Sequence, residues 1–469
     1  MKYVGWVKKY KYALGISVLM LSNLFIYTNC GKSYNKSSFP NVENFIQENN
    51  GGGSNNNIGS PQFPDLVWSG QIQFGLTPRD YERTKVMRFD SQNNLYMAGD
   101  LNIGGFVNAH IFLNKYDRLG QLQWSRQLAS NSSEGISDIA VSDDDNKIYI
   151  VGHTNGNLAG PNSAQGSSDM FIAQYDSTGT QQWIKQLGWG ASDLAKAVVI
   201  DSAGFVYVGG GSNGMSTFTP NFNGQTIIKF DSAGNQIWAK QWGNSPGGII
   251  RSMAIDENGH IYALGNHTSM SGDFFIAQLD TSGNVLWINT SITNYYASDR
   301  CKLVLKLGKL SVIAETRGDA DGNGADPTSF DAVVAQFDLS GNQLWLKQIR
   351  STIGKAEWLY GLDVDADGAI YISGHTEGSL FATNLGPYQG YHDIFMQKID
   401  MNGNVVWSRQ IAETEDVVTY TLRLDRNNEK LALSIYASNW LGTPAIFASP
   451  LVSDGDTFVE LFDLNGNML

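Results

Sequence analysis

The sequence lacks the features that mark disulfide-rich, nucleic-acid-binding and membrane-spanning proteins. Only two cysteines occur in 469 residues, which excludes a fold held together by several disulfides. Acidic side chains outnumber basic ones by 45 to 32, and the formal net charge is −13. Because a nucleic-acid interface needs a basic patch or stripe, this balance argues against nucleic acid as a partner. We interpret the acidic excess as a source of solubility.

The hydrophobic run near the N-terminus is too short to span a bilayer. Residues 13–27 form a largely apolar run of 15 residues, whereas a membrane helix needs about 20. The run follows a basic start made of Lys2, Lys8, Lys9 and Lys11. A basic start before a short apolar core is typical of a secretory signal peptide, which we place at residues 1–29.

Cys30 directly follows this core, as in a bacterial lipobox, where the cysteine thiol is lipidated. Tyr27 and Asn29 depart from the commonest pattern, and the segment resembles the relaxed lipobox of spirochaetal lipoproteins. The resemblance implies a lipid anchor on Cys30 and a place in the bacterial cell envelope, at the outer membrane or cell surface. An ordinary cleaved signal, or an uncleaved anchor with an incidental cysteine, is the alternative. With Cys30 lipidated, Cys301 has no partner and is interpreted as a buried, inert thiol.

Residues 30–64 contain little that a folded core would bury. The stretch from Gly51 to Asn57 consists of glycine, serine and asparagine only. Such a composition predicts a flexible coil, and we interpret this segment as a linker that holds the folded body away from the membrane.

Residues 65–469 repeat one motif, in which an apolar residue and Asp are followed at fixed spacing by Gly and then Trp. Six copies end at Trp124, Trp183, Trp238, Trp287, Trp345 and Trp407. A seventh copy begins at Phe462, reaches Gly466 and stops at Leu469, one residue before its tryptophan. Trp68 stands alone near the start, and the residues after it resemble those that follow Trp407. We therefore expect Trp68–Ile72 to complete the last repeat.

Each repeat predicts four short antiparallel strands. In the turn before the tryptophan strand, Asp can accept hydrogen bonds from turn amides, and Gly can adopt the positive φ of a tight hairpin. Seven such sheets, with the N-terminal strand in the last one, predict an all-β, seven-bladed β-propeller, because ring closure leaves no sheet incomplete. The most divergent turn is expected at Lys306–Lys309, where Leu307-Gly308 replaces the Asp pattern.

These repeats resemble those of the bacterial seven-bladed β-propeller repeat proteins (SBBP), which are often lipoproteins. The resemblance covers about residues 65–469 and implies the fold, but it supplies no chemistry.

Alternate connections of an antiparallel sheet emerge on the same side, so the long connections between second and third strands should share one face. Variable loops on a rigid scaffold are frequent binding sites, and this face is our candidate interaction face. Aromatic residues expected there are Trp189, Tyr295, Tyr296, Tyr388, Tyr391 and Trp440. They fit an unknown protein or glycan partner, or they pack the loops onto the ring.

A weak calcium site is a further candidate. Asp319, Asp321 and Asn323 place oxygen donors at alternate positions, with Gly324 sixth. Phe330 stands where an EF-hand has its Glu, so that pattern is incomplete. No other cofactor is expected.

The sequence favours a monomeric, lipid-anchored, non-enzymatic binding or scaffolding module that acts through its long-loop face. The alternative is an enzyme that uses the axial funnel, either a hydrolase or a quinone-dependent dehydrogenase. No catalytic motif in suitable sequence context supports it.

Overall fold

The structure is a computed structural model whose described residues all belong to the predicted ring of blades. They are residues 70–72, 81–102, 109–161, 163, 167–189, 192–212, 224–242, 248–266, 274–290, 298–322, 329–351, 354–380, 392–411, 417–427, 429–437 and 456–469. The signal segment, Cys30, the linker and Trp68 lie outside them. No described segment is a helix with the length and hydrophobicity needed to cross a bilayer.

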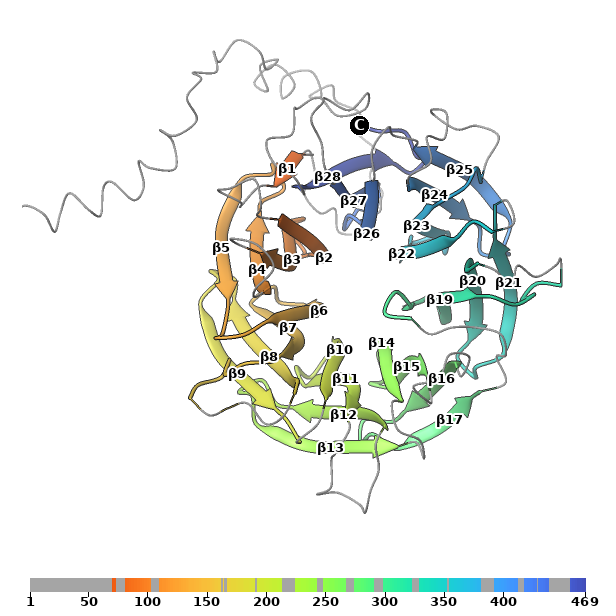
Figure 1. Ribbon diagram of the computed structural model, residues 1–469. Coiled ribbons are helices and arrows are strands. Elements are labelled where there is room, and N and C mark those ends of the chain that lie inside the picture. Colours follow the sequence, from red (N-terminus) through yellow and green to blue (C-terminus); the bar gives the residue numbers. More distant parts are fainter. Residues whose placement is uncertain are drawn as a thin grey trace, which may run out of the picture. The chain divides into compact units, whose positions relative to one another are not determined.

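Seven antiparallel sheets of four strands each surround a central axis, which confirms the seven-bladed β-propeller (Figure 1). Blade 1 is β2 (Tyr81–Phe89), β3 (Leu95–Asn102), β4 (Ala109–Tyr116) and β5 (Leu122–Leu128); blade 2 is β6 (Glu134–Val141), β7 (Lys147–Thr154), β8 (Asp169–Asp176) and β9 (Gln181–Leu187); blade 3 is β10 (Asp193–Ile200), β11 (Val206–Ser212), β12 (Gly224–Phe230) and β13 (Gln236–Trp242). Blade 4 is β14 (Ile249–Ile255), β15 (Ile261–Asn266), β16 (Phe274–Leu279) and β17 (Val285–Asn289); blade 5 is β18 (Lys302–Lys306), β19 (Lys309–Thr316), β20 (Asp331–Asp338) and β21 (Gln343–Ile349); blade 6 is β22 (Glu357–Val364), β23 (Ile370–Thr376), β24 (Asp393–Ile399) and β25 (Val405–Ile411). Blade 7 is β26 (Val417–Leu424), β27 (Lys430–Ala437), β28 (Asp456–Asp463) and β1 (Gly70–Ile72).

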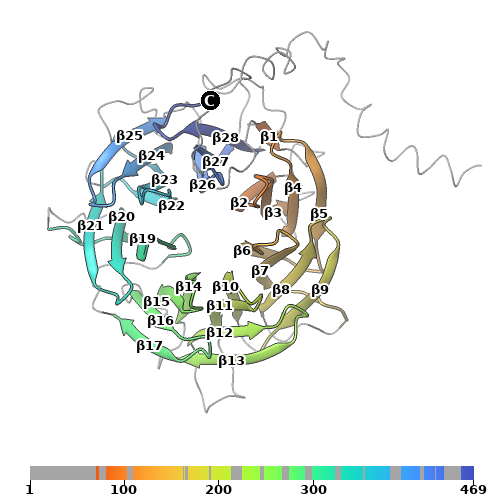
Figure 2. The ribbon, with the colours of Figure 1, turned by 180° about the vertical axis from the view of Figure 1, so that it is seen from behind.

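The N-terminal strand completes blade 7, as the split repeat predicted. β1 pairs with β28 in antiparallel register, with Gly70 opposite Val459 and Ile72 opposite Thr457. The first strand of every blade lies innermost and contacts the first strands of both neighbouring blades, including β2 with β26 (Figure 2). These contacts close the ring around the central axis.

The Asp turns have the predicted geometry. In blade 3, Asp231 Oδ1 accepts hydrogen bonds from Ala233 N at 2.9 Å and Asn235 N at 2.8 Å, and Gly234 has φ of 82°. The divergent turn of blade 5 differs as expected. Leu307 and Gly308 both have positive φ, 50° and 68°, which is the requirement of a two-residue type I′ hairpin.

The repeated tryptophans hold adjacent blades together. The Trp407 ring lies 6.2 Å from the Tyr371 ring of its own blade, and its Nε1 donates to Leu464 O of the next blade at 2.8 Å. A Cβ on Gly466 would lie 2.9 Å from the Trp407 ring, so the turn glycine is also the surface that receives the indole. Five other tryptophans meet a turn glycine of the next blade in the same way: Trp124, Trp183, Trp238, Trp287 and Trp345.

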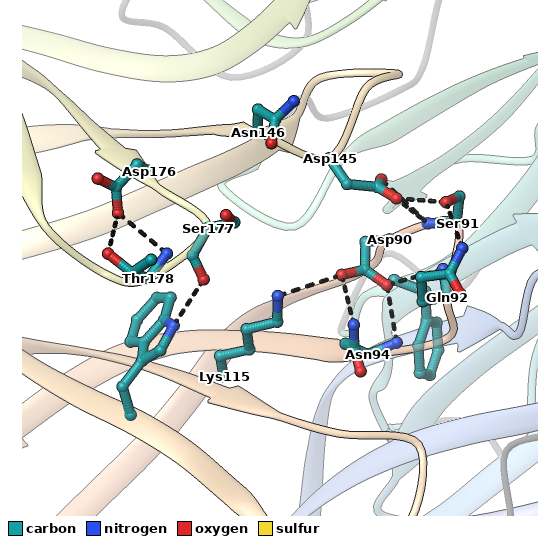
Figure 3. Close-up of polar contacts among 12 residues, drawn as sticks. Asp90, Ser91, Gln92, Asn94, Lys115, Asp145, Asn146, Asp176, Ser177 and Thr178 are labelled. Carbon is teal, nitrogen blue, oxygen red and sulfur yellow. Dashed lines mark hydrogen bonds and ion pairs between the residues drawn. The ribbon is translucent and has the colours of Figure 1, made fainter.

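Polar contacts on the same face reinforce this junction between blades 1 and 2 (Figure 3). Ser91 N, in the first turn of blade 1, donates to Asp145 Oδ1 of blade 2 at 3.0 Å. Within blade 1, Lys115 Nζ lies 3.4 Å from Asp90 Oδ2; Asp90 is buried and Lys115 is half-buried. Tight turns therefore fill this face of the ring, which we call the turn face. The opposite side, onto which the connections between second and third strands open, is the long-loop face.

Candidate axial binding site

The predicted aromatic residues of the long-loop face are only partly described. Trp189 is half-buried and packs against the apolar core between blades 2 and 3. Its backbone N donates to Asp193 Oδ2 at 2.8 Å. Tyr295, Tyr296, Tyr388, Tyr391 and Trp440 lie outside the described residues. Trp189 thus contributes to packing, and the interaction face built on these aromatics stays a prediction.

In the candidate calcium loop, one of the predicted carboxylate ligands already forms an ion pair. Asp321 forms an ion pair with Arg350, whose Nε also lies 3.8 Å from Asp331 Oδ2. Asn323 lies outside the described residues. Among the residues that the structure describes, no group of three or more His, Cys, Asp or Glu side chains is arranged to hold a metal ion. The Asp319 loop therefore stays a prediction, with an arginine already competing for Asp321.

A site that the sequence did not reveal lies on the axis, where β-bulges redirect side chains of the innermost strands. A bulge inserts one residue into a strand and re-aims its side chain. Register shifts occur within six of the innermost strands, and the residues at the shifts are Lys85, Ser137, Lys196, Arg251, Tyr360 and Tyr420. In blade 5, β18 pairs without such a shift, and Arg300 and Lys302 occupy the corresponding region. All eight side chains line one cavity of about 230 Å³.

This loop-side cavity adjoins a second one toward the turn face. The turn-side cavity has a volume of about 520 Å³, and Lys196, Arg251 and Lys302 line both cavities. Nine cationic and four acidic side chains line the two cavities together. The channel is therefore cationic in a protein whose net charge is −13.

The cations of the channel are incompletely paired with acids. Lys196 Nζ lies 3.2 Å from Asp299 Oδ1, and Arg251 pairs with the same carboxylate, whose side chain is 66% exposed. Arg423 donates to the backbone oxygens of Met87, at 3.2 Å, and Leu362, at 3.0 Å. The side chain of Lys302, in contrast, has no hydrogen-bond or ion-pair partner among the described parts of the chain, although its backbone lies opposite Ile313 in the sheet.

The acids within the channel are held by backbone amides. Asp138 Oδ2 accepts from Val198 N of the next blade at 3.1 Å, and its Oδ1 lies 3.5 Å from Arg88. Asp363 Oδ2 similarly accepts from Leu424 N of the next blade at 2.9 Å. These carboxylates connect neighbouring blades, and they keep their negative charge beside the cations of the channel.

Two lysines have pKa values close to neutrality. Burial lowers the pKa of Lys302 to about 8; Asp138 opposes this shift, and Arg423 and Arg88 add to it. Burial also lowers the pKa of Lys196 to about 8, with further lowering by Arg251 and Lys85 and opposition from Asp100. Both lysines remain mainly protonated at pH 7.

Aromatic rings form the remaining sector of the loop-side cavity. Tyr360 and Tyr420 meet edge to face, with ring centroids 5.5 Å apart. Arg300 lies over the Tyr360 ring at 5.5 Å and pairs with Glu315. Tyr360 also stacks on His375 at 5.1 Å, which fixes its ring. The cavity thus has an aromatic wall on blades 6 and 7 and a cationic wall on blades 1, 3, 4 and 5.

Comparison with known proteins supports the repeat. Residues 123–159 and 182–215 match the family model described as Beta-propeller repeat (SBBP), so the chain contains repeats of that family. The regulatory protein FlaEY of Caulobacter vibrioides is 26% identical over 213 residues, which are 40% of this chain and 21% of that protein. The chain thus spans about a fifth of that relative's length.

Solved structures of low sequence identity are similar along most of the chain. A chain of Kuenenia stuttgartiensis hydrazine synthase has a TM-score of 0.47 at 13% identity, with 85% of this chain and 100% of that chain covered. A protein of unknown function from Dyadobacter fermentans has a TM-score of 0.44 at 9% identity, with coverages of 84% and 98%. These likenesses carry no activity over to this chain.

Proposed function

We propose that this chain is a lipid-anchored, non-enzymatic binding module of the bacterial envelope, whose ligand enters the axial channel from the long-loop face. The observation that carries the proposal is the convergence of side chains from all seven blades on one loop-side cavity. A concave site with a few polar groups on a rigid scaffold is the usual form of a small-ligand site. The signal-like N-terminus and Cys30 support the anchor.

Blocking the loop-side cavity should abolish ligand binding without disturbing the ring. Ser137 is the smallest of the residues at the bulges, so Ser137→Trp fills the cavity and removes little contact. Ser282→Trp is the matched control, because Ser282 is exposed on a turn of the opposite face.

The full chain is screened against soluble glycans and small organic acids by thermal shift, because a ligand of the folded state raises the melting temperature. We expect each ligand-induced shift to disappear in Ser137→Trp and to persist in Ser282→Trp. Shifts that survive in both variants would place binding elsewhere and defeat the proposal.

Lipidation is tested separately at the cysteines. Cells that express Cys30→Ala should incorporate no labelled fatty acid into the protein, because the acylated thiol is gone. Cys301→Ala serves as the control and should be labelled like the wild type, since Cys301 is buried in the core of blade 5. Labelling that persists in Cys30→Ala would show that this cysteine is not the anchor.

A further inference from the structure

We propose that the axial channel binds a small polyanion, whose phosphate or carboxylate oxygens lie between Lys196, Arg251 and Lys302. This inference rests on the proposed function, because it names the ligand class for the same channel. The three side chains come from three consecutive blades and line both cavities, so they lie on one side of the axis where the two linings overlap.

Uncompensated charge in the channel favours an anionic ligand. Charged groups that are taken out of water are costly unless they are paired. Lys302 has no ion-pair partner within the described chain, and Lys196 shares the exposed Asp299 with Arg251. A bound anion would supply the missing counter-charge at the meeting point of the cavities.

The shape of the channel also favours a bound anion. Low-dielectric walls concentrate the field of like charges and raise the local concentration of an oppositely charged ligand. The four acids of the lining offset only part of the charge of its nine cations, even though Lys85 and Arg300 also pair with Asp100 and Glu315 outside the lining. The lining of the channel therefore carries an excess of positive charge, whereas the whole protein has a net charge of −13.

Volume and aromatic lining limit the size of the ligand. The loop-side cavity of about 230 Å³ admits a compact molecule and excludes a folded protein segment. Tyr360 and Tyr420 offer a ring face beside the cations, which suits an anionic group carried on a small carbon skeleton. The chemistry is that of a phosphorylated or polycarboxylated small molecule.

The pH dependence of binding follows from the two lysines. As pH rises through about 8, Lys196 and Lys302 lose their protons, and the attraction for an anion falls. Protonation of Lys302 is opposed by Arg423 and Arg88 and favoured by Asp138 and Cys301. Lys196 faces Arg251, Lys85 and Asp100, and it forms an ion pair with Asp299. The stability of the unliganded protein should instead rise with pH. Each of these lysines has a lower pKa in the folded state than in the unfolded state, so it destabilises the fold while it is charged. This destabilisation is relieved as pH rises from about 8 to the pKa of lysine in the unfolded state.

The test uses calorimetric titration of the full chain with tripolyphosphate in one arm and citrate in the other. We expect binding in at least one arm, at least tenfold weaker at pH 9.5 than at pH 7 and weakened by added salt. Lys302→Met should weaken binding about 10- to 100-fold, because a charge-assisted contact is lost. Its unliganded melting temperature should be no lower than that of the wild type, because an unpaired cation is removed. Lys185→Met, on the outer strand β9, is the matched control and should bind normally.

The outcomes separate this inference from the proposed function. If neither polyanion binds, or if Lys302→Met binds like the wild type, the polyanion assignment is wrong. If an uncharged glycan then binds and Ser137→Trp abolishes that binding, the channel remains the binding site for a different ligand class. Binding in the citrate arm alone assigns carboxylates, and binding in the tripolyphosphate arm alone assigns phosphates.

Discussion

Deletion of residues 65–72 should open the ring and leave a protein that unfolds or aggregates. The deletion removes β1 and leaves β28 with an unpaired outer edge, which is a template for association with other chains. It also removes Trp68. The repeat predicts that Trp68 meets Gly120, because each of the other motif tryptophans contacts the corresponding glycine of the next blade. Size-exclusion chromatography and thermal melting measure the effect.

Deletion of residues 31–57 is the matched control for ring closure. This segment belongs to the predicted linker, so its removal should leave the melting temperature and the monomeric elution volume unchanged. A monomer with unchanged melting after deletion of residues 65–72 would contradict the closure of the ring by β1.

Trp407→Ala should destabilise the protein by about 3 kcal/mol, which is typical of the loss of a large packed aromatic side chain. The indole packs against the core of blades 6 and 7, and it donates to Leu464 O at 2.8 Å. Its removal leaves a void beside Gly466 at the junction that holds the final turn of the chain.

The adjacent residue provides the control for this substitution. Val406 lies on the same strand but points outward, with 56% of its surface exposed. Val406→Ala should therefore change the free energy of unfolding by less than about 0.5 kcal/mol. Denaturant unfolding measures both variants. Equal stability of Trp407→Ala and Val406→Ala would show that the tryptophan does not hold the blades together.

The fold could be predicted because its determinants recur along the chain. Asp and Gly at fixed spacing specify the turns, and Trp at fixed spacing specifies the junctions between blades. The unfinished repeat ending at Leu469 specified the partner of β1. The sequence identified the turn at Leu307-Gly308 as divergent, but the positive φ of Leu307 did not follow from it, because residues with a Cβ rarely adopt that conformation.

The axial site could not be predicted in the same way, because it depends on bulges and on convergence in space. Lys196 and Arg251 each stand alone in apolar strand sequence, Ala195-Lys196-Ala197 and Ile250-Arg251-Ser252. The alternation of apolar and polar residues along a strand does not reveal a β-bulge. The bulges at Lys196 and Arg251 shift the register and direct these side chains toward the axis. An alignment of the seven repeats with one another would have placed Lys196, Arg251 and Tyr360 at the same repeat position. This shared position is the sequence signal that could have identified the axial site.

The most direct measurement of the central claim is anomalous X-ray diffraction from crystals of the full chain soaked in selenate, an oxyanion with a strong anomalous signal. We expect a peak in the channel beside Lys196, Arg251 and Lys302, and no such peak in crystals of Lys302→Met. Selenate peaks confined to the outer surface, with an empty axis in the wild type, would contradict an anion site in the channel.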